Sequence, residues 1–502
     1  MPTARLTLDP RATVGAIDRR LFGSFVEHLG RCVYDGIYEP SHPAADEDGF
    51  RTDVLDLVRE LGVSTVRYPG GNFVSGYRWE DGVGPREDRP RRRDLAWHST
   101  ETNEIGLDEF ASWARKAGSE LMYAVNLGTR GVLDALDVLE YANGGAGTTL
   151  ADRRVANGTP EPHGIRMWCL GNEMDGPWQL GASTPEEYAE IAAKTASAMR
   201  QVDPTLELIV CGSSSSQMPT FGRWERVVLE RAYEDVDFIS CHAYYEPKDG
   251  DLGSFLASAT DMDRFIESVV ATADAVKAAR RSDKEIAISF DEWNVWYQSR
   301  FHEVDKITDV DEWPVAPRLL EDGYCVMDAV VVGNLLISLL RHADRVTSAS
   351  LAQLVNVIAP IMTEPGGPAW RQTTFFPFAE TSRHARGVTL DIAVEAPEYE
   401  TARFGRVPLV DAVATHDAES GASTVFAVNR SLDEEVVLEI DVSRLDASAS
   451  LSARLLSDAD IHARNTLQDP ERVSLREVAV DRDGEVATLT LPAVSWVVVE
   501  IR

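Results

Sequence analysis

The chain is 502 residues long, 44% hydrophobic and 26% charged, which suits a folded protein with one large domain and a smaller companion. Its 49 Lys and Arg residues against 82 Asp and Glu residues give a net charge of −33, which argues against nucleic acid and anionic membrane surfaces as partners. In so acidic a chain, the basic run Arg89-Pro90-Arg91-Arg92-Arg93 is interpreted as a solvated loop without functional weight.

The cysteines and the apolar segments indicate the cellular compartment of the protein. The five cysteines are widely spaced and never form a CxxC pair, so neither a disulfide framework nor a zinc knuckle is predicted. The first residues lack the apolar core of a signal peptide, and the apolar stretch 329–340 is too short to span a bilayer and is interpreted as a buried helix. We therefore expect a cytoplasmic protein with reduced thiols.

Between about residues 20 and 380, short segments rich in β-branched residues alternate with segments of helical period. The helix after the fourth strand is the clearest, because Thr184, Pro185 and Glu187 form a capping-box start. Eight parallel strands joined by helical crossovers close most simply as a (β/α)₈ TIM barrel, in which chemistry sits at the carboxyl ends of the strands. The predicted strands are 21–27, 63–68, 120–126, 165–170, 206–211, 236–242, 286–291 and 346–351.

The pattern changes after about residue 385 to short strands separated by Asp, Ser and Gly turns, at 423–428, 436–442, 486–491 and 496–501. This pattern predicts a β-sandwich, expected to be jelly-roll-like. A strand at 4–8 precedes the barrel and is expected to pair with the sandwich, because chain ends commonly lie close together. The predicted division is therefore an N-terminal strand region at 1–18, a catalytic barrel at 19–384 and a β-sandwich domain at 385–502.

Two glutamates follow predicted barrel strands. Asn172 and Glu173 come directly after the fourth strand, and Glu292 follows the seventh. Hydrolysis of a glycosidic bond needs one carboxyl group to protonate the leaving oxygen and another to attack, or to activate water, on the opposite face of the sugar. A single glutamate is more often a solvated surface residue or one member of an ion pair. Two at the mouth of one barrel favour a glycoside hydrolase.

The chain resembles glycoside hydrolases of the barrel clan that carry the acid/base on strand four, directly after an Asn, and the nucleophile on strand seven. Within that clan it is most similar to the α-L-arabinofuranosidases of glycoside hydrolase family 51, and the resemblance covers the whole barrel in order. It rests on the blocks Phe22-Gly23-Ser24-Phe25-Val26-Glu27-His28, Arg67-Tyr68-Pro69-Gly70-Gly71-Asn72-Phe73, Gly171-Asn172-Glu173-Met174-Asp175-Gly176, His242-Ala243-Tyr244-Tyr245 and Asp291-Glu292-Trp293-Asn294-Val295-Trp296.

The resemblance implies Glu173 as acid/base and Glu292 as nucleophile of a retaining, exo-acting enzyme. Such an enzyme would release terminal non-reducing α-L-arabinofuranosyl residues from arabino- or arabinoxylo-oligosaccharides. For several pocket residues an ordinary structural role is the alternative, such as an Arg67–Glu27 ion pair or core packing of the tryptophans. The implied sugar-binding residues are Glu27, Arg67, Asn72, Trp97, Asn172, His242, Tyr244, Trp296 and Gln353.

No metal-site spacing is apparent in the His and acidic residues, so hydrolysis without metal or cofactor is expected. The resemblance also implies a homo-oligomer, and we expect a hexamer. Two alternatives stay open. The same clan contains retaining β-xylosidases and endoglucanases, and a barrel can also be a carbohydrate-binding protein without catalysis, since fold alone does not prove function.

Overall fold

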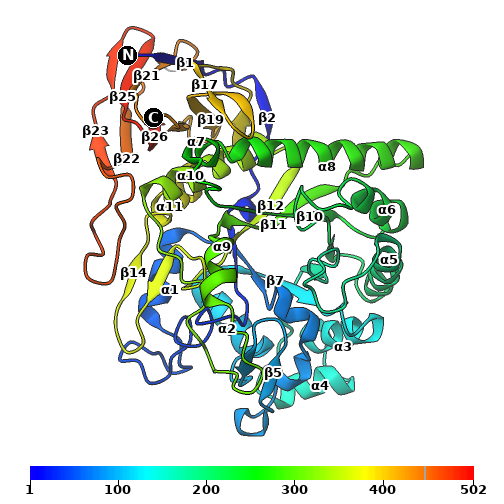
Figure 1. Cartoon of the computed structure of the whole chain (residues 1–502). Coiled ribbons are helices and arrows are strands. Elements are labelled where there is room, and N and C mark those ends of the chain that lie inside the picture. The colour runs from blue at the N-terminus through cyan, green and yellow to red at the C-terminus, as the bar shows by residue number, and fades with distance from the viewer. Residues whose placement is uncertain (446–447) are drawn as a thin grey trace.

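The computed structural model describes residues 1–445 and 448–502 (Figure 1). Within these residues, eight parallel strands close into a barrel, as the alternating pattern predicted. The strands follow one another around the barrel in chain order, with β12 returning to β3. They are β3 (Gly23–Phe25), β4 (Thr65–Tyr68), β7 (Glu120–Val125), β8 (Met167–Leu170), β9 (Glu207–Val210), β10 (Phe238–Tyr245), β11 (Ala287–Val295) and β12 (Val346–Ala352).

Helices between these strands cover the outside of the barrel (Figure 1). The best-defined start is that of α5, where the Thr184 side chain accepts from the Glu187 N–H and the Glu187 carboxylate accepts from the Thr184 N–H, which confirms the capping box. The main helices are α1 (Thr52–Leu61), α2 (Leu107–Ala117), α3 (Val132–Asn143), α4 (Thr149–Ala156), α5 (Pro185–Val202), α6 (Arg223–Ala232), α8 (Ala259–Arg280), α10 (Val326–Arg341) and α11 (Phe375–His384).

The apolar stretch 329–340 lies in α10, and it is buried as expected. One side of α10 packs on the barrel strands β11 and β12, and another packs on strands β19 (Val410–His416), β20 (Ser423–Asn429) and β26 (Ser495–Ile501). Close approach to β26 requires Gly333, because a Cβ there would lie 2.2 Å from the Trp496 ring. In the described parts of the chain, no helix combines the length and the apolar character that crossing a bilayer requires.

Two antiparallel-rich sheets pack together beyond the barrel through a separate apolar core. The first has the order β16-β1-β21-β25-β24, and its strand β1 pairs in parallel with β21. These strands are β16 (Val394–Glu395), β1 (Thr3–Thr7), β21 (Val436–Asp441), β25 (Val486–Leu491) and β24 (Asp481–Asp483). The second has the order β2-β15-β19-β20-β26-β22-β23, in which the strands not yet given are β2 (Thr13–Ala16), β15 (Val388–Leu390), β22 (Leu451–Leu456) and β23 (Arg476–Val478). The N-terminal strand therefore lies among the C-terminal strands at the top of Figure 1.

Strands β10 and β11 run further than the sequence indicated. The predicted ends were residues 242 and 291, but β10 ends at Tyr245 and β11 at Val295. The register between them shifts at Ser240 and His242, and that between β11 and β12 shifts again between Phe290 and Trp293. Such irregularities re-aim side chains next to functional sites. Glu292 thus projects from within a strand rather than from the loop after it.

Candidate active site

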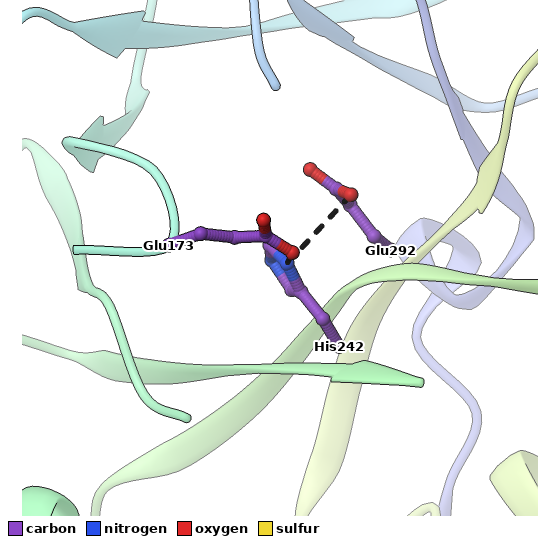
Figure 2. A group of neighbouring side chains, drawn as sticks. All are labelled: Glu173, His242 and Glu292. Atoms are coloured by element: carbon purple, nitrogen blue, oxygen red, sulfur yellow. Dashed lines mark hydrogen bonds and ion pairs between the residues drawn. The ribbon is translucent and has the colours of Figure 1, made fainter. Parts of the chain in front are cut away.

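Glu173 is placed at the barrel mouth by a tight turn after β8. Gly171 has a φ of 94°, and Glu173 itself has a φ of 43°, a left-handed conformation that costs energy in a residue with a side chain. The Glu173 carbonyl accepts from the Gly176 N–H at 2.8 Å, which closes the turn. Glu292 reaches the same space from β11, and its carboxyl group faces that of Glu173 in Figure 2.

Glu173, His242 and Glu292 converge at the centre of the site (Figure 2). One atom of each lies within 4.8 Å of the others, so the two carboxylates approach each other to that distance. The Nδ1 atom of His242 lies 2.9 Å from Oε1 of Glu173 and 3.7 Å from Oε2 of Glu292. Burial alone would lower the pKa of His242, but the charge of Glu292 and the hydrogen bond to Glu173 raise it. His242 therefore links the two carboxyl groups.

Glu292 is held as a carboxylate by donors on both of its oxygens. Arg67 donates from Nη1 to Oε1 at 2.8 Å, and the Tyr244 hydroxyl donates to Oε2 at 2.7 Å. Burial opposes ionisation, but the charges of His242 and Arg67 and these hydrogen bonds keep the pKa of Glu292 below its ordinary value. A buried, ionised carboxylate with fixed orientation is suited to nucleophilic attack.

Arg67 connects the Glu292 carboxylate to the asparagines at the barrel mouth. It is 1% exposed, and its Nη2 donates to Oδ1 of Asn172 at 2.6 Å. The Asn172 amide in turn lies 3.4 Å from Oδ1 of Asn72. Below it, Arg67 Nε is 3.7 Å from Oδ2 of Asp291. Arg67 therefore balances the charges of Asp291 and Glu292 while it orients Asn172.

Glu27 forms a second buried acidic position in the same pocket. Its Oε1 accepts from the Phe73 N–H and from Nε1 of Trp97, each at 2.8 Å, and Gln353 Nε2 lies 3.1 Å from its Oε2. Burial nevertheless raises the pKa of Glu27 well above its ordinary value. Glu27 does not pair with Arg67, which was the structural alternative for those two residues.

The two tryptophans of the predicted site lie beside its polar centre and are both half-buried. Trp97 stands edge-on to Phe301 with ring centroids 5.9 Å apart, and its position is fixed by Asp94, whose carboxylate accepts from the Trp97 N–H. Trp296 packs edge-on against Tyr244 at 5.0 Å. Each indole is therefore neither fully in the core nor free in solvent.

Each predicted site residue contacts at least one other, in one group around Glu292 and a second around Glu27, and the structure adds Trp178. This side chain is 53% exposed, yet its Nε1 donates to Oε2 of Glu173 at 2.6 Å. The turn that begins at Glu173 brings Trp178 back over the carboxyl group, five residues further along the chain. Nothing in the spacing alone indicated this contact. Asp291, beside Arg67, was quoted only as part of a sequence block.

A divalent cation could be held at the spacing of Glu173, His242 and Glu292. Among the described residues this is the one cluster with such geometry. The ligand atoms already have protein partners, since His242 bonds to Glu173, and Arg67 and Tyr244 donate to Glu292. The arrangement of these three side chains therefore fits proton transfer between two carboxyl groups as well as it fits metal binding.

Two carboxyl groups so close together can act on one bond from opposite sides, which is the chemistry of glycoside hydrolases. The model for the α-L-arabinofuranosidase 1 domain matches residues 57–265, and that for the α-L-arabinofuranosidase C-terminal domain matches residues 291–495. An intracellular exo-α-(1→5)-L-arabinofuranosidase of Streptomyces lividans is 60% identical, over 99% of this chain and 75% of that protein. An exo-α-(1→6)-L-arabinofuranosidase of Bifidobacterium longum is 57% identical, over 99% and 97% respectively.

Among solved structures, a family 51 α-L-arabinofuranosidase from Bifidobacterium longum superposes with a TM-score of 0.96 at 54% identity, over 100% of both chains. A family 44 xyloglucanase of Paenibacillus polymyxa superposes with a TM-score of 0.59 at 10% identity, which shows a shared fold alone. The chain belongs to the α-L-arabinofuranosidases of glycoside hydrolase family 51, as its sequence blocks indicated.

Proposed function

We propose that the protein removes terminal α-L-arabinofuranosyl residues by double displacement, with Glu173 as acid/base and Glu292 as nucleophile. The observation that carries this proposal is the approach of the two carboxylates to within 4.8 Å. Retaining glycosidases place their carboxyl groups about 5 Å apart, whereas inverting enzymes leave room for a water at about 6.5 to 9.5 Å. The spacing supports net retention of the anomeric configuration.

In the first step, an oxygen of Glu292 attacks the anomeric carbon while the bond to the leaving oxygen breaks. Glu173 gives its proton to that oxygen, so the aglycone leaves as a neutral alcohol and an arabinofuranosyl ester forms on Glu292. Arg67 and Tyr244 keep the attacking carboxylate oriented before the attack. The same donors stabilise it again when it is released.

In the second step, the ionised Glu173 takes a proton from water, and the resulting hydroxide attacks the anomeric carbon. The ester bond breaks, Glu292 recovers its carboxylate, and arabinose is released with its original configuration. His242 contacts both carboxyl groups, so it can compensate charge as the proton moves through the cycle. No step requires a metal ion.

The remaining pocket residues are proposed to bind the furanose hydroxyls. Hydrogen-bonding groups of this kind hold a sugar in one orientation and can strengthen their contacts in the transition state. Trp97 and Trp296 offer indole surfaces beside the polar centre, where a sugar ring can stack. The proposed hydrogen-bonding residues are Glu27, Arg67, Asn72, Asn172, His242, Tyr244 and Gln353.

The proposed substrates are arabino- and arabinoxylo-oligosaccharides, and the proposed location is the cytoplasm. Several relatives are named exo-α-L-arabinofuranosidases, which supports an arabinofuranosyl substrate, and the word intracellular in some of these names supports the location. We further propose a homo-oligomer, with a hexamer as the expected state. Light scattering of the purified protein should then give six times the chain mass, and a monomer would refute that state.

The test of mechanism and specificity uses aryl glycosides and proton NMR. We expect cleavage of an aryl α-L-arabinofuranoside and slow or no cleavage of the matching β-D-xyloside and glucoside. The first sugar detected should have the anomeric configuration of the substrate. If the opposite anomer appears first, double displacement is wrong. Cleavage of the xyloside or glucoside alone would leave the two-glutamate chemistry but remove the arabinofuranosyl specificity.

A further inference from the structure

A cavity of about 680 Å³ lies beside the proposed sugar pocket, and none of the steps above uses it. Its volume falls within the range of about 300–1,000 Å³ that is usual for small-molecule sites. It lies among the loops that follow β4, β7 and β8, and Thr129, Leu180 and Asn103 are among its lining residues. The cavity is therefore large enough for sugar units beyond the one that is cleaved.

Two contacts and one shared chain segment connect this cavity to the reacting centre. Phe73, which lines it, donates its N–H to the Glu27 carboxylate. Asp94, which also lines it, accepts from the N–H of Trp97. Leu180 lies in the segment that carries Trp178, the side chain that donates to Glu173. Because the proposed acid/base gives its proton to the leaving oxygen, the side next to Glu173 is the side on which the aglycone departs.

Ion pairs neutralise part of the charge in this cavity. Four arginines and four acidic residues line it. Arg92 pairs with Asp81 at 2.8 Å, and Arg130 pairs with Glu80 at 2.6 Å. Those two pairs account for half of the arginines.

The other two acidic residues are buried in the wall of the cavity. Glu101 is 5% exposed and bonds to His28, whereas Asp94 is 6% exposed and accepts backbone N–H groups. Burial raises the pKa of Asp94 to about 7, which reduces its negative charge near neutral pH. Neither carboxyl group pairs with an arginine of the cavity.

Arg78 and Arg93 are left as exposed cations in the cavity wall. Within residues 1–445 and 448–502, the Arg78 side chain has no hydrogen bond or ion pair. In the same described part of the chain, the Arg93 guanidinium group donates to the backbone carbonyls of Val310 and Asp311, each at 3.4 Å, and lies over the face of Trp313, but it has no ion pair. The chain has a net charge of −33, so the positive charge of these two guanidinium groups is opposite in sign to the net charge of the molecule. Guanidinium groups bind carboxylates through paired hydrogen bonds.

We propose that this cavity binds the carboxylate of an acidic sugar in the aglycone, so that the enzyme favours arabinofuranosides attached to uronate-bearing oligosaccharides. The proposal rests on the proposed function, because it assigns the leaving-group side from the role of Glu173. Arg78 and Arg93 would receive the carboxylate, and Leu180 and Phe73 would contact the apolar faces of the sugar.

The test compares two arabinofuranosyl oligosaccharides that differ only in a uronate or a neutral hexose next to the cleaved sugar. The wild-type enzyme should have the higher kcat/KM on the acidic substrate, and added salt should reduce that preference. In Arg78→Gln/Arg93→Gln, kcat/KM for the acidic substrate should fall roughly ten- to a hundredfold, mainly through KM, as loss of charge-assisted hydrogen bonds predicts. Activity on the neutral substrate should stay within about twofold of wild type by the same reasoning.

Arg115→Gln/Arg226→Gln is the matched control. It removes the same charge from exposed helix positions, on α2 and α6, and both substrates should be unaffected. Equal losses on both substrates in the cavity variant, or none on either, would overturn the proposal. Failure of the wild-type enzyme to cleave the neutral arabinofuranoside would instead contradict the proposed function, so the two failures are distinguishable.

Discussion

Substitution of Gly71 tests whether activity depends on the exact position of the Glu27 carboxylate. Its φ is 60° and its ψ is −161°, a combination that favours glycine. A Cβ at this position would lie 2.3 Å from the carboxyl carbon of Glu27, whereas ordinary contacts begin at 3.4 Å. Gly71→Ala should therefore displace the Glu27 carboxylate by about 1 Å and weaken its bonds to Phe73 and Trp97.

The expected cost follows from that displacement. A misplacement of about 1 Å in an active site can reduce the rate about a hundredfold, so kcat/KM of Gly71→Ala for an aryl arabinofuranoside should fall by that order. The strained backbone should also lower the free energy of unfolding by about 1–3 kcal/mol. Steady-state kinetics and urea unfolding measure the two effects separately.

Gly118→Ala is the control for backbone strain without a clash. Gly118 also has a positive φ, of 79°, but no atom lies within 4 Å of the position of its Cβ. This variant should lose about 1 kcal/mol of stability and keep its kcat/KM. If Gly71→Ala stayed as active as Gly118→Ala, the proposed role of Glu27 as a positioned sugar-binding group would be wrong.

Three further predictions concern the central carboxylates. Tyr244→Phe removes a hydrogen-bond donor that lowers the pKa of Glu292, so the pKa of Glu292 should rise. The acidic limb of the kcat/KM–pH profile should then move to higher pH, and a limb that does not move would contradict this role of Tyr244. The indole of Trp178 positions Glu173, so Trp178→Phe should reduce kcat/KM about tenfold or more for substrates with poor leaving groups and less for nitrophenyl substrates. Equal losses on both kinds of substrate would indicate that Trp178 has a purely structural role. Activity should survive EDTA treatment, whereas a loss restored by a divalent cation would assign the Glu173–His242–Glu292 cluster to a metal.

The barrel and the positions of its two glutamates could be predicted because their signals are local. Glu173 follows a short apolar strand and Glu292 lies towards the end of another, and parallel strands bring such positions to one end of a barrel. The exact ends of β10 and β11 could not be predicted, because their extension depends on register shifts set by the neighbouring strands.

Contacts across loops were the part that the sequence could not predict. Trp178 was not singled out, because only the folded turn after β8 places its indole on Glu173. The basic run at 89–93 was interpreted as a solvated loop, but this was wrong for part of it, because Arg92 and Arg93 lie in strand β5 (Arg92–Asp94) and the Arg89 side chain is only 4% exposed. Arg89 pairs with Glu109 and Arg92 with Asp81, whereas Arg93 lines the cavity without a carboxylate partner. Ion pairing between residues that are distant in the sequence therefore decides which of these arginines can bind a ligand.

The proposed mechanism requires that Glu292 becomes covalently bound to the sugar and that Glu173 is needed to release it. The most direct measurement is intact and peptide mass spectrometry of Glu173→Ala after mixing with a nitrophenyl α-L-arabinofuranoside, whose leaving group needs little protonation. We predict that the chain gains the mass of one arabinofuranosyl unit, that this mass maps to Glu292, and that azide removes it as arabinofuranosyl azide. An unmodified chain during turnover, or a label on another residue, would contradict the account.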